Sequence, residues 1–192
     1  SCSSGRVIPC CVDTQRFEAA NEDVRKQVRG KLAVTDRFVI AYVGSFGGWY
    51  LSEELFDLFA VARQVEPNTF ITVLTQREPE KVSERLKMIG FSAADFLVQS
   101  AAPFEMPTYL SAADAGVSFI KPCYSKQASS PTKNAEYLAS GLPIITNTGI
   151  GDVEDDVGQS EGLVRWRRQH LADIAPVDSV LHHPAFQTDA AS

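Results

Sequence analysis

The chain has 192 residues, the usual size of one domain, and is long enough to bury a single core. Hydrophobic residues make up 44% and charged residues 22% of it, as in ordinary globular proteins, which argues against a disordered or membrane-embedded chain. The net charge of −6 opposes binding to a polyanion, so we expect no nucleic-acid partner, although a local basic pocket can still bind a small phosphate ligand.

The sequence gives no signal for export, for structural zinc or for a membrane span. No apolar run reaches the roughly 20 residues that cross a bilayer, and the cysteines lack paired C-x-x-C spacing. We therefore expect reduced thiols and a cytoplasmic location. Residues 5–9 resemble a strand already under way, so we expect one domain of a longer protein, with any membrane contact made only through the missing part. The cysteines are Cys2, Cys10, Cys11 and Cys123.

Helical and strand patterns alternate along the chain. The first helix is predicted at 21–32, where Val24, Val28 and Leu32 form one apolar stripe. An unbroken apolar run at 38–43 then predicts a strand buried on both faces. The same alternation predicts further helices at 53–65, 79–89, 103–112 and 132–140, and further strands at 69–74, 96–98, 115–119 and 143–146.

This alternation predicts an α/β fold with a doubly wound, mostly parallel sheet. Ligands of such sheets bind beyond the carboxyl ends of the strands, where the strand order reverses. The loops at 44–52, 75–78, 99–102, 121–131 and 147–152 are therefore the candidate binding loops. The pattern weakens after residue 164, and 170–192 indicates only a helix followed by a tail.

A glycine-rich loop follows the predicted strand at 38–43. Gly44, Gly47 and Gly48, with Ser45 between them, let the backbone approach a ligand closely, and phosphate suits the start of a following helix. The loop matches a dinucleotide fingerprint poorly, because Tyr50 stands near the place of the third small residue. A glycine turn that only needs positive φ remains an equal alternative.

The start of the predicted helix at 132–140 is the more specific signal. Ser130 and Pro131 are typical of a helix start, whose N–H groups bind anions, and Lys133 would add a cation for a diphosphate. Glu136, three residues later, could accept hydrogen bonds from the two hydroxyls of a ribose. The alternative is an exposed lysine and glutamate paired on the helix surface.

Four motifs in order along the chain resemble one enzyme family. They are VIPCCVDTQRF at 7–17, YVGS at 42–45, YLSAADAGV at 109–117, and KNAEYLASGLPII at 133–145 followed by GIGD at 149–152. Together these motifs resemble group 1 glycosyltransferases of the GT-B fold, the retaining family four. The resemblance extends over 7–157.

The resemblance implies a C-terminal, Rossmann-like domain that binds a nucleoside-diphosphate sugar, with the acceptor held by an N-terminal domain that this chain lacks. It also implies a retaining glycosyl transfer without a metal cofactor, the isolated domain being inactive alone. Residues 1–18 would be the interdomain segment, 19–165 the binding domain and 166–192 a C-terminal helix and tail. By the same resemblance Glu136 binds the ribose, the backbone of Pro131, Thr132 and Lys133 binds the diphosphate, and Gln99 and Ser100 face the base.

The sequence also departs from the family pattern. Ala128 replaces the first glutamate of E-x7-E, Ser45 stands at the place of a basic residue, and Trp49 or Tyr50 stands at the place of a second. Efficient transfer needs a replacement for those cations, since the leaving diphosphate develops negative charge. The candidates are Arg77, Lys121, Lys126 and Lys133.

These departures leave the catalytic residues unassigned, with Lys133 as the only candidate. A non-catalytic nucleotide-binding or interaction module therefore stays open as the main alternative, followed by a sugar-nucleotide epimerase. The acidic cluster at 152–156 lies at a helix start, where charge favours the helix dipole, so we expect no metal site there.

Overall fold

The computed structural model describes residues 12–18, 21–121, 131–147 and 163–165. The helices are α1 (Gln15–Glu18), α2 (Glu22–Leu32), α3 (Ser52–Val65), α4 (Pro79–Met88), α5 (Met106–Ser111) and α6 (Thr132–Ala139). The strands are β1 (Phe38–Val43), β2 (Thr69–Leu74), β3 (Phe96–Gln99), β4 (Ala115–Ser118), β5 (Ile144–Thr146) and β6 (Leu163–Arg165).

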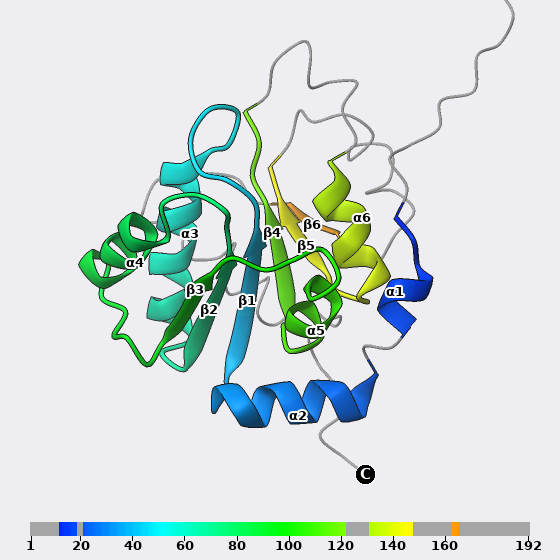
Figure 1. Cartoon of the computed structure of the whole chain (residues 1–192). Coiled ribbons are helices and arrows are strands. Elements are labelled where there is room, and N and C mark those ends of the chain that lie inside the picture. Colours follow the sequence, from blue (N-terminus) through cyan, green and yellow to red (C-terminus); the bar gives the residue numbers. More distant parts are fainter. Residues whose placement is uncertain (1–11, 19–20, 122–130, 148–162, 166–192) are drawn as a thin grey trace, which may run out of the picture.

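The strands form one sheet in the order β3-β2-β1-β4-β5-β6, and every neighbouring pair is parallel. The predicted doubly wound α/β fold is therefore confirmed. The order reverses between β1 and β4, which makes their carboxyl ends the switch point where ligands of such sheets bind. These ends lie at the top of Figure 1, and α2 crosses the opposite edge at the bottom.

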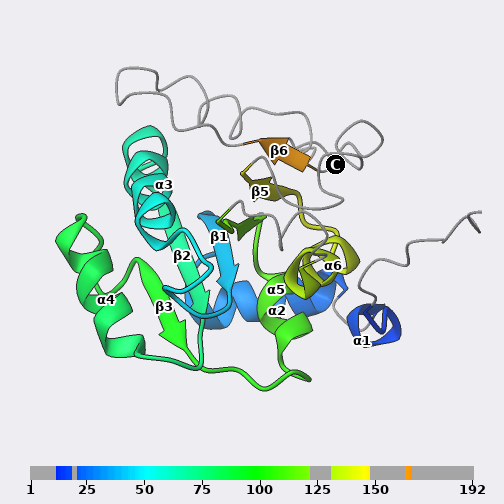
Figure 2. The same ribbon diagram turned by 90° about the horizontal axis from the view of Figure 1, so that it is seen from above.

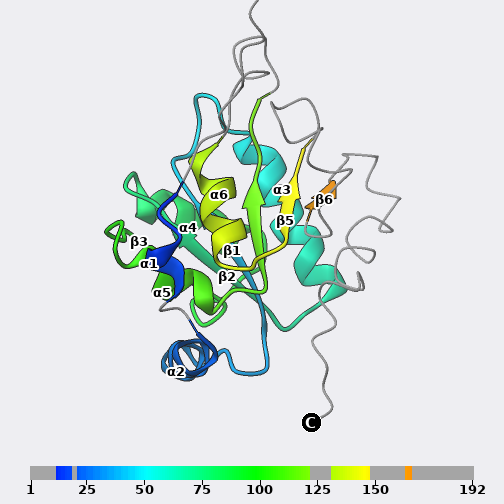
Figure 3. The ribbon, with the colours of Figure 1, turned by 90° about the vertical axis from the view of Figure 1, so that its right-hand side faces the viewer.

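Helices cover both faces of the sheet, as the view from above shows (Figure 2). Strand β1 divides its side chains between two cores because successive residues point to opposite faces. Ile40 and Tyr42 pack with α3 and α4, whereas Val39, Ala41 and Val43 pack toward α5 and α6. Figure 3 shows α6 lying against β4 on the face opposite α3. This sandwich explains the unbroken apolar run in the strand.

Local side-chain chemistry sets several helix boundaries. Helix α2 begins after Asn21, whose side-chain oxygen accepts a hydrogen bond from the amide of Val24 at 3.1 Å. Helix α5 begins at Met106, three residues later than predicted, because the Glu105 carboxylate accepts from the amide of Ala102 at 2.7 Å and closes a turn there. The edge strand β6 was not predicted.

Several predictions concern residues outside the described part of the chain. No structure can be given for Ser130, Ala128, Lys126, the cysteines, the acidic cluster at 152–156 or the tail at 166–192. The predicted domain boundaries stay predictions. Among the described residues, no helix combines the length and the apolar character needed to cross a membrane.

Candidate functional site

The carboxyl edge of the sheet gathers the residues that the sequence singled out. Gly44 directly follows β1, Arg77 lies three residues after β2, and Gln99 is the last residue of β3. Backbone bonds extend the ladder past the strands, from Gly44 N to Leu74 O at 3.0 Å and from Thr75 N to Gln99 O at 2.9 Å. The start of α6 reaches the same edge (Figure 1).

Lys133 links α6 to the loop after β1. Its Nζ lies 4.5 Å from the ring centroid of Tyr42 and 4.3 Å from that of Tyr50. A Cβ atom added to Gly44 would stand 3.1 Å from the same Nζ, so the glycine leaves the space that the lysine occupies. Tyr42 belongs to the core on the α3 side, whereas α6 covers the other face, and Lys133 therefore reaches across the carboxyl edge of the sheet.

The side chain of Lys133 is buried, with only 8% of the residue exposed. Within the described part of the chain, its Nζ has no hydrogen-bond partner. Burial lowers the pKa of Lys133 to about 7, and the nearby charge of Glu136 only partly opposes this effect. The alternative of an exposed surface lysine is thus wrong. Lys133 is a buried amine held near its point of ionisation.

Tyr137 fixes the position of α6 on the sheet. Its ring lies against Gly116 so closely that an added Cβ would stand 2.6 Å away. The Tyr137 hydroxyl accepts a hydrogen bond from the amide of Val43 at 2.9 Å and donates to the carbonyl of Val117 at 3.1 Å. Burial raises the pKa of Tyr137, so the hydroxyl keeps its proton. This one side chain therefore joins β1, β4 and α6 at the switch point.

Glu136 lies half-buried in α6, three residues after Lys133. Burial raises the pKa of its carboxyl group, whereas the charges of Arg16 on α1 and of Lys133 lower it. Arg16 is held near the site because its guanidinium donates to the carbonyl of Pro103. The predicted contact of Glu136 with a ribose stays a prediction.

The glycine loop folds back toward β4 before α3 begins. Gly44, Gly47 and Gly48 all have positive φ, so the turn itself requires them. The carbonyl of Trp49 accepts a hydrogen bond from the amide of Lys121 at 2.8 Å. Helix α3 carries two glutamates in its first turn, which disfavour an anion there. The start of α6 suits a phosphate better than the start of α3.

The other predicted ligand residues are spread around this edge. Ser100 and Lys121 are exposed, and Gln99 is partly buried. The exposed Arg77 borders a cavity of about 390 Å³ between the glycine loop, α3 and α4, together with Phe46 and Lys81. Ser45 accepts a hydrogen bond from the Tyr42 hydroxyl at 2.7 Å through its backbone carbonyl.

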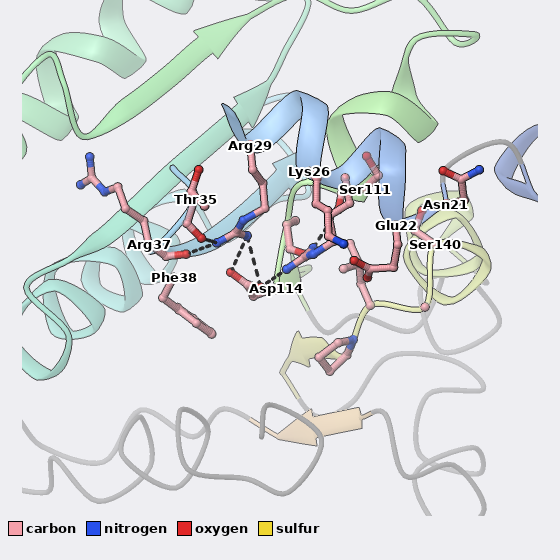
Figure 4. A pocket seen from close by; sticks show the side chains of 15 residues that line it. Asn21, Glu22, Lys26, Arg29, Thr35, Arg37, Phe38, Ser111, Asp114 and Ser140 are labelled. Atoms are coloured by element: carbon pink, nitrogen blue, oxygen red, sulfur yellow. Dashed lines mark hydrogen bonds and ion pairs between the residues drawn. The ribbon is translucent and has the colours of Figure 1, made fainter. Parts of the chain in front are cut away.

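A larger cavity, about 640 Å³, lies at the opposite edge of the sheet (Figure 4). Its arginines already bind the protein: Arg29 contacts Asp114 at 3.1 Å and the carbonyl of Ala112 at 2.8 Å, and Arg25 binds the same carboxylate at 2.5 Å. Asp114 in turn accepts from the amide of Val39 at 2.7 Å. These charges are used to anchor α2 to the sheet. Among the described residues, no group of three or more histidine, cysteine or acidic side chains could hold a metal.

Comparison with known proteins places this fold. No protein-family model matches the sequence, and no curated protein sequence does either. Among solved structures, WaaG, a glycosyltransferase of lipopolysaccharide biosynthesis, has 18% identity and a TM-score of 0.66 over 95% of this chain and 47% of its own. The C-terminal domain of the group 1 glycosyltransferase LpcC from Francisella tularensis has 18% identity and a TM-score of 0.61 over 88% of this chain and 87% of its own.

A third neighbour was crystallised with a nucleotide sugar. HepE from Anabaena, in complex with UDP-glucose, has 15% identity and a TM-score of 0.62 over 89% of this chain and 46% of its own. The chain has the fold of one Rossmann-like half of a GT-B glycosyltransferase. It spans about half the length of WaaG and HepE, and at these identities the likeness to the GT-B proteins is one of fold.

The sequence did not predict the contacts that three residues of the site make. Tyr42 and Tyr50 enclose the Lys133 amine, and Arg16 faces Glu136 from α1. The sequence offered one signal for Tyr50, its place near that of a basic residue in the family pattern. Tyr42 and Arg16 stand in the motifs at 42–45 and 7–17, but neither motif predicted their contacts with α6, because these contacts form only when the chain folds.

Proposed function

We propose that this chain is the donor-binding half of a retaining group 1 glycosyltransferase, which transfers a sugar from a nucleoside diphosphate to an acceptor held by an N-terminal domain. The proposal rests on one observation: a buried lysine without a hydrogen-bond partner among the described residues lies at the start of α6, on the carboxyl edge of a GT-B half. A buried donor of this kind is costly to leave without a hydrogen-bond acceptor, and a phosphate oxygen can supply one.

The diphosphate is assigned to the start of α6. The first N–H groups of a helix have no partner inside it, and the N-cap residue, Pro131, provides no side-chain hydrogen bond to them. The helix dipole and the Lys133 amine both favour negative charge at this point. Gly44, which has no side chain, leaves room for the Lys133 amine beside the end of β1.

The nucleoside is assigned to the residues on either side of the diphosphate. The Glu136 carboxylate can accept hydrogen bonds from two neighbouring ribose hydroxyls. The backbone at Gln99 and Ser100, where β3 ends, would face the base. We expect no metal requirement, because the helix start and Lys133 supply the positive charge.

Transfer itself would use the same positive charge. As the glycosidic bond to the diphosphate breaks, negative charge grows on the leaving phosphate, and a well-placed donor can lower the barrier by about 3 kcal/mol. In this account Lys133 stabilises the leaving group, and the acceptor domain completes the site. The isolated chain is expected to bind the donor without transferring the sugar.

Isothermal titration calorimetry of the isolated chain with UDP-glucose, GDP-mannose and ADP-glucose tests donor binding. We expect one of them to bind at micromolar to millimolar concentration, and Lys133→Met to weaken that binding at least tenfold. Lys31→Met, an exposed lysine of α2 at the opposite edge, is the matched control and should bind like the parent. Failure of all three donors to bind at millimolar concentration would refute the proposal.

A second candidate function is a nucleotide-binding module without transferase activity. It is favoured by Ser45, Trp49 and Tyr50, which replace basic residues of the family pattern and leave Lys133 as the cation in contact with Gly44. The two candidates differ in the full-length protein. Lys133→Met and Glu136→Gln should each reduce sugar transfer if the chain is a transferase half. Sugar transfer by these variants at the rate of the parent, or a parent protein that transfers no sugar, would favour the non-catalytic module.

A further inference from the structure

We propose that donor binding at the start of α6 is coupled to the uptake of one proton by the Lys133 amine. The proposal rests on the proposed function, and it adds how the site changes its charge when the ligand arrives. In the free protein part of the population carries a neutral amine, and the diphosphate binds the ammonium form.

The surroundings of Nζ support a neutral amine in the free state. An ammonium group has three donors to satisfy, yet this one is buried and no hydrogen bond to it is made within the described residues. The faces of Tyr42 and Tyr50 attract a cation but accept no conventional hydrogen bond. Burial thus dominates, and the pKa of Lys133 falls from 10.5 to about 7.

A diphosphate would reverse this balance. Its oxygens accept hydrogen bonds from the ammonium and bring negative charge beside it, and both effects raise the pKa of a lysine. At pH 8 the neutral amine of Lys133 therefore takes one proton from the buffer as the diphosphate binds, and the product is an ion pair of ammonium and diphosphate. Below pH 7 the proton is already present and no uptake is expected.

The other ionisable groups around Lys133 are few in the described structure. Tyr42 of β1 and Tyr137 of α6 have pKa values raised by burial and stay protonated. Tyr50 of the glycine loop lies over the amine, and Glu136 of α6 faces it, with Arg16 of α1 acting on Glu136. Since burial also raises the pKa of Glu136, this carboxyl group is the competing source of any proton uptake.

Calorimetry in buffers of different ionisation enthalpy counts the protons. The titrant is whichever of UDP-glucose, GDP-mannose and ADP-glucose binds the isolated chain, because the diphosphate of each is esterified at both ends and does not ionise between pH 6 and 9. At pH 8 we expect close to one proton to be taken up. Affinity should fall by about tenfold per pH unit above pH 7, and level off below it.

Two variants assign the proton. Lys133→Met should bind more weakly, take up no proton and lose the pH dependence, whereas Glu136→Gln should keep the uptake. Parent binding without proton uptake at pH 8, or an uptake that persists in Lys133→Met, would overturn this proposal and leave the proposed function standing. Absence of binding by any donor at every pH would overturn both.

Discussion

Replacing Lys133 by methionine should stabilise the fold while weakening its ligand binding. Methionine keeps an unbranched side chain between Tyr42 and Tyr50 but removes the buried amine. The fall of the Lys133 pKa from 10.5 to about 7 corresponds to a cost on the order of 5 kcal/mol for holding the ammonium in the folded state.

The expected gain is therefore on the order of 5 kcal/mol at pH 6, or a rise of about 10–20 °C in Tm for a chain of this size. The sign follows from proton linkage: the unfolded lysine stays protonated up to pH 10.5, whereas the folded one loses its proton above about 7. The cost is thus complete below pH 7 and declines as pH rises from 7 to 10.5. The advantage of the methionine variant should shrink over that range.

Thermal unfolding followed by circular dichroism at pH 6 and pH 9.5 measures this difference, with Lys31→Met as the control for loss of a surface charge. An unchanged or lower Tm of Lys133→Met at pH 6 would refute the reasoning. A gain that is as large at pH 9.5 as at pH 6 would show that the stabilisation does not come from the ionisation of Lys133.

The remaining predictions concern the supports of the site and of the sheet. Tyr137→Phe leaves the buried amide of Val43 without its partner and should cost about 1–3 kcal/mol of unfolding free energy, measured by urea denaturation. A parent-like midpoint would show that the Tyr137 hydroxyl does not hold β1 to α6. Gly116→Ala places a Cβ 2.6 Å from the Tyr137 ring and should lower the unfolding free energy by about 1–3 kcal/mol. Gly30→Ala is the control: its Cβ meets open space in α2 and should not destabilise the fold. Equal losses in the two variants would contradict the steric explanation. Partial burial alone would raise the pKa of Asp95, but hydrogen bonds from Ser92 and Arg37 and the charge of Arg63 hold that pKa well below its usual range. The ionised carboxylate therefore stabilises the fold above about pH 4 and loses that effect at lower pH. Asp95→Asn should therefore differ from the parent more at pH 6 than at pH 2, and a constant difference in unfolding free energy would disprove it.

The central strands could be read from the sequence because they are buried on both faces. Both the run at 38–43 and the run at 69–74 lie within single strands of the sheet, and both consist almost wholly of apolar and β-branched residues. Strand β6 has only three residues, too few for a pattern to appear. The late start of α5 depends on a carboxylate of Glu105 that turns back to the chain before it.

The site was predictable only in its local part. Helix-start chemistry placed Lys133 at the carboxyl edge of the sheet without any knowledge of its neighbours. Its burial could not be predicted, because the rings of Tyr42 and Tyr50 reach the amine from a strand and a loop far earlier in the chain. The helix-start motif thus located Lys133, whereas the packing of side chains from both faces of the sheet lowers its pKa.

The direct test of the account is a crystal structure of the chain with the nucleotide sugar that binds it. We predict the diphosphate at the first turn of α6, hydrogen-bonded to Nζ of Lys133, with the ribose against Glu136. A diphosphate bound elsewhere, for example among the arginines near Asp114 at the opposite edge, would contradict the central claim.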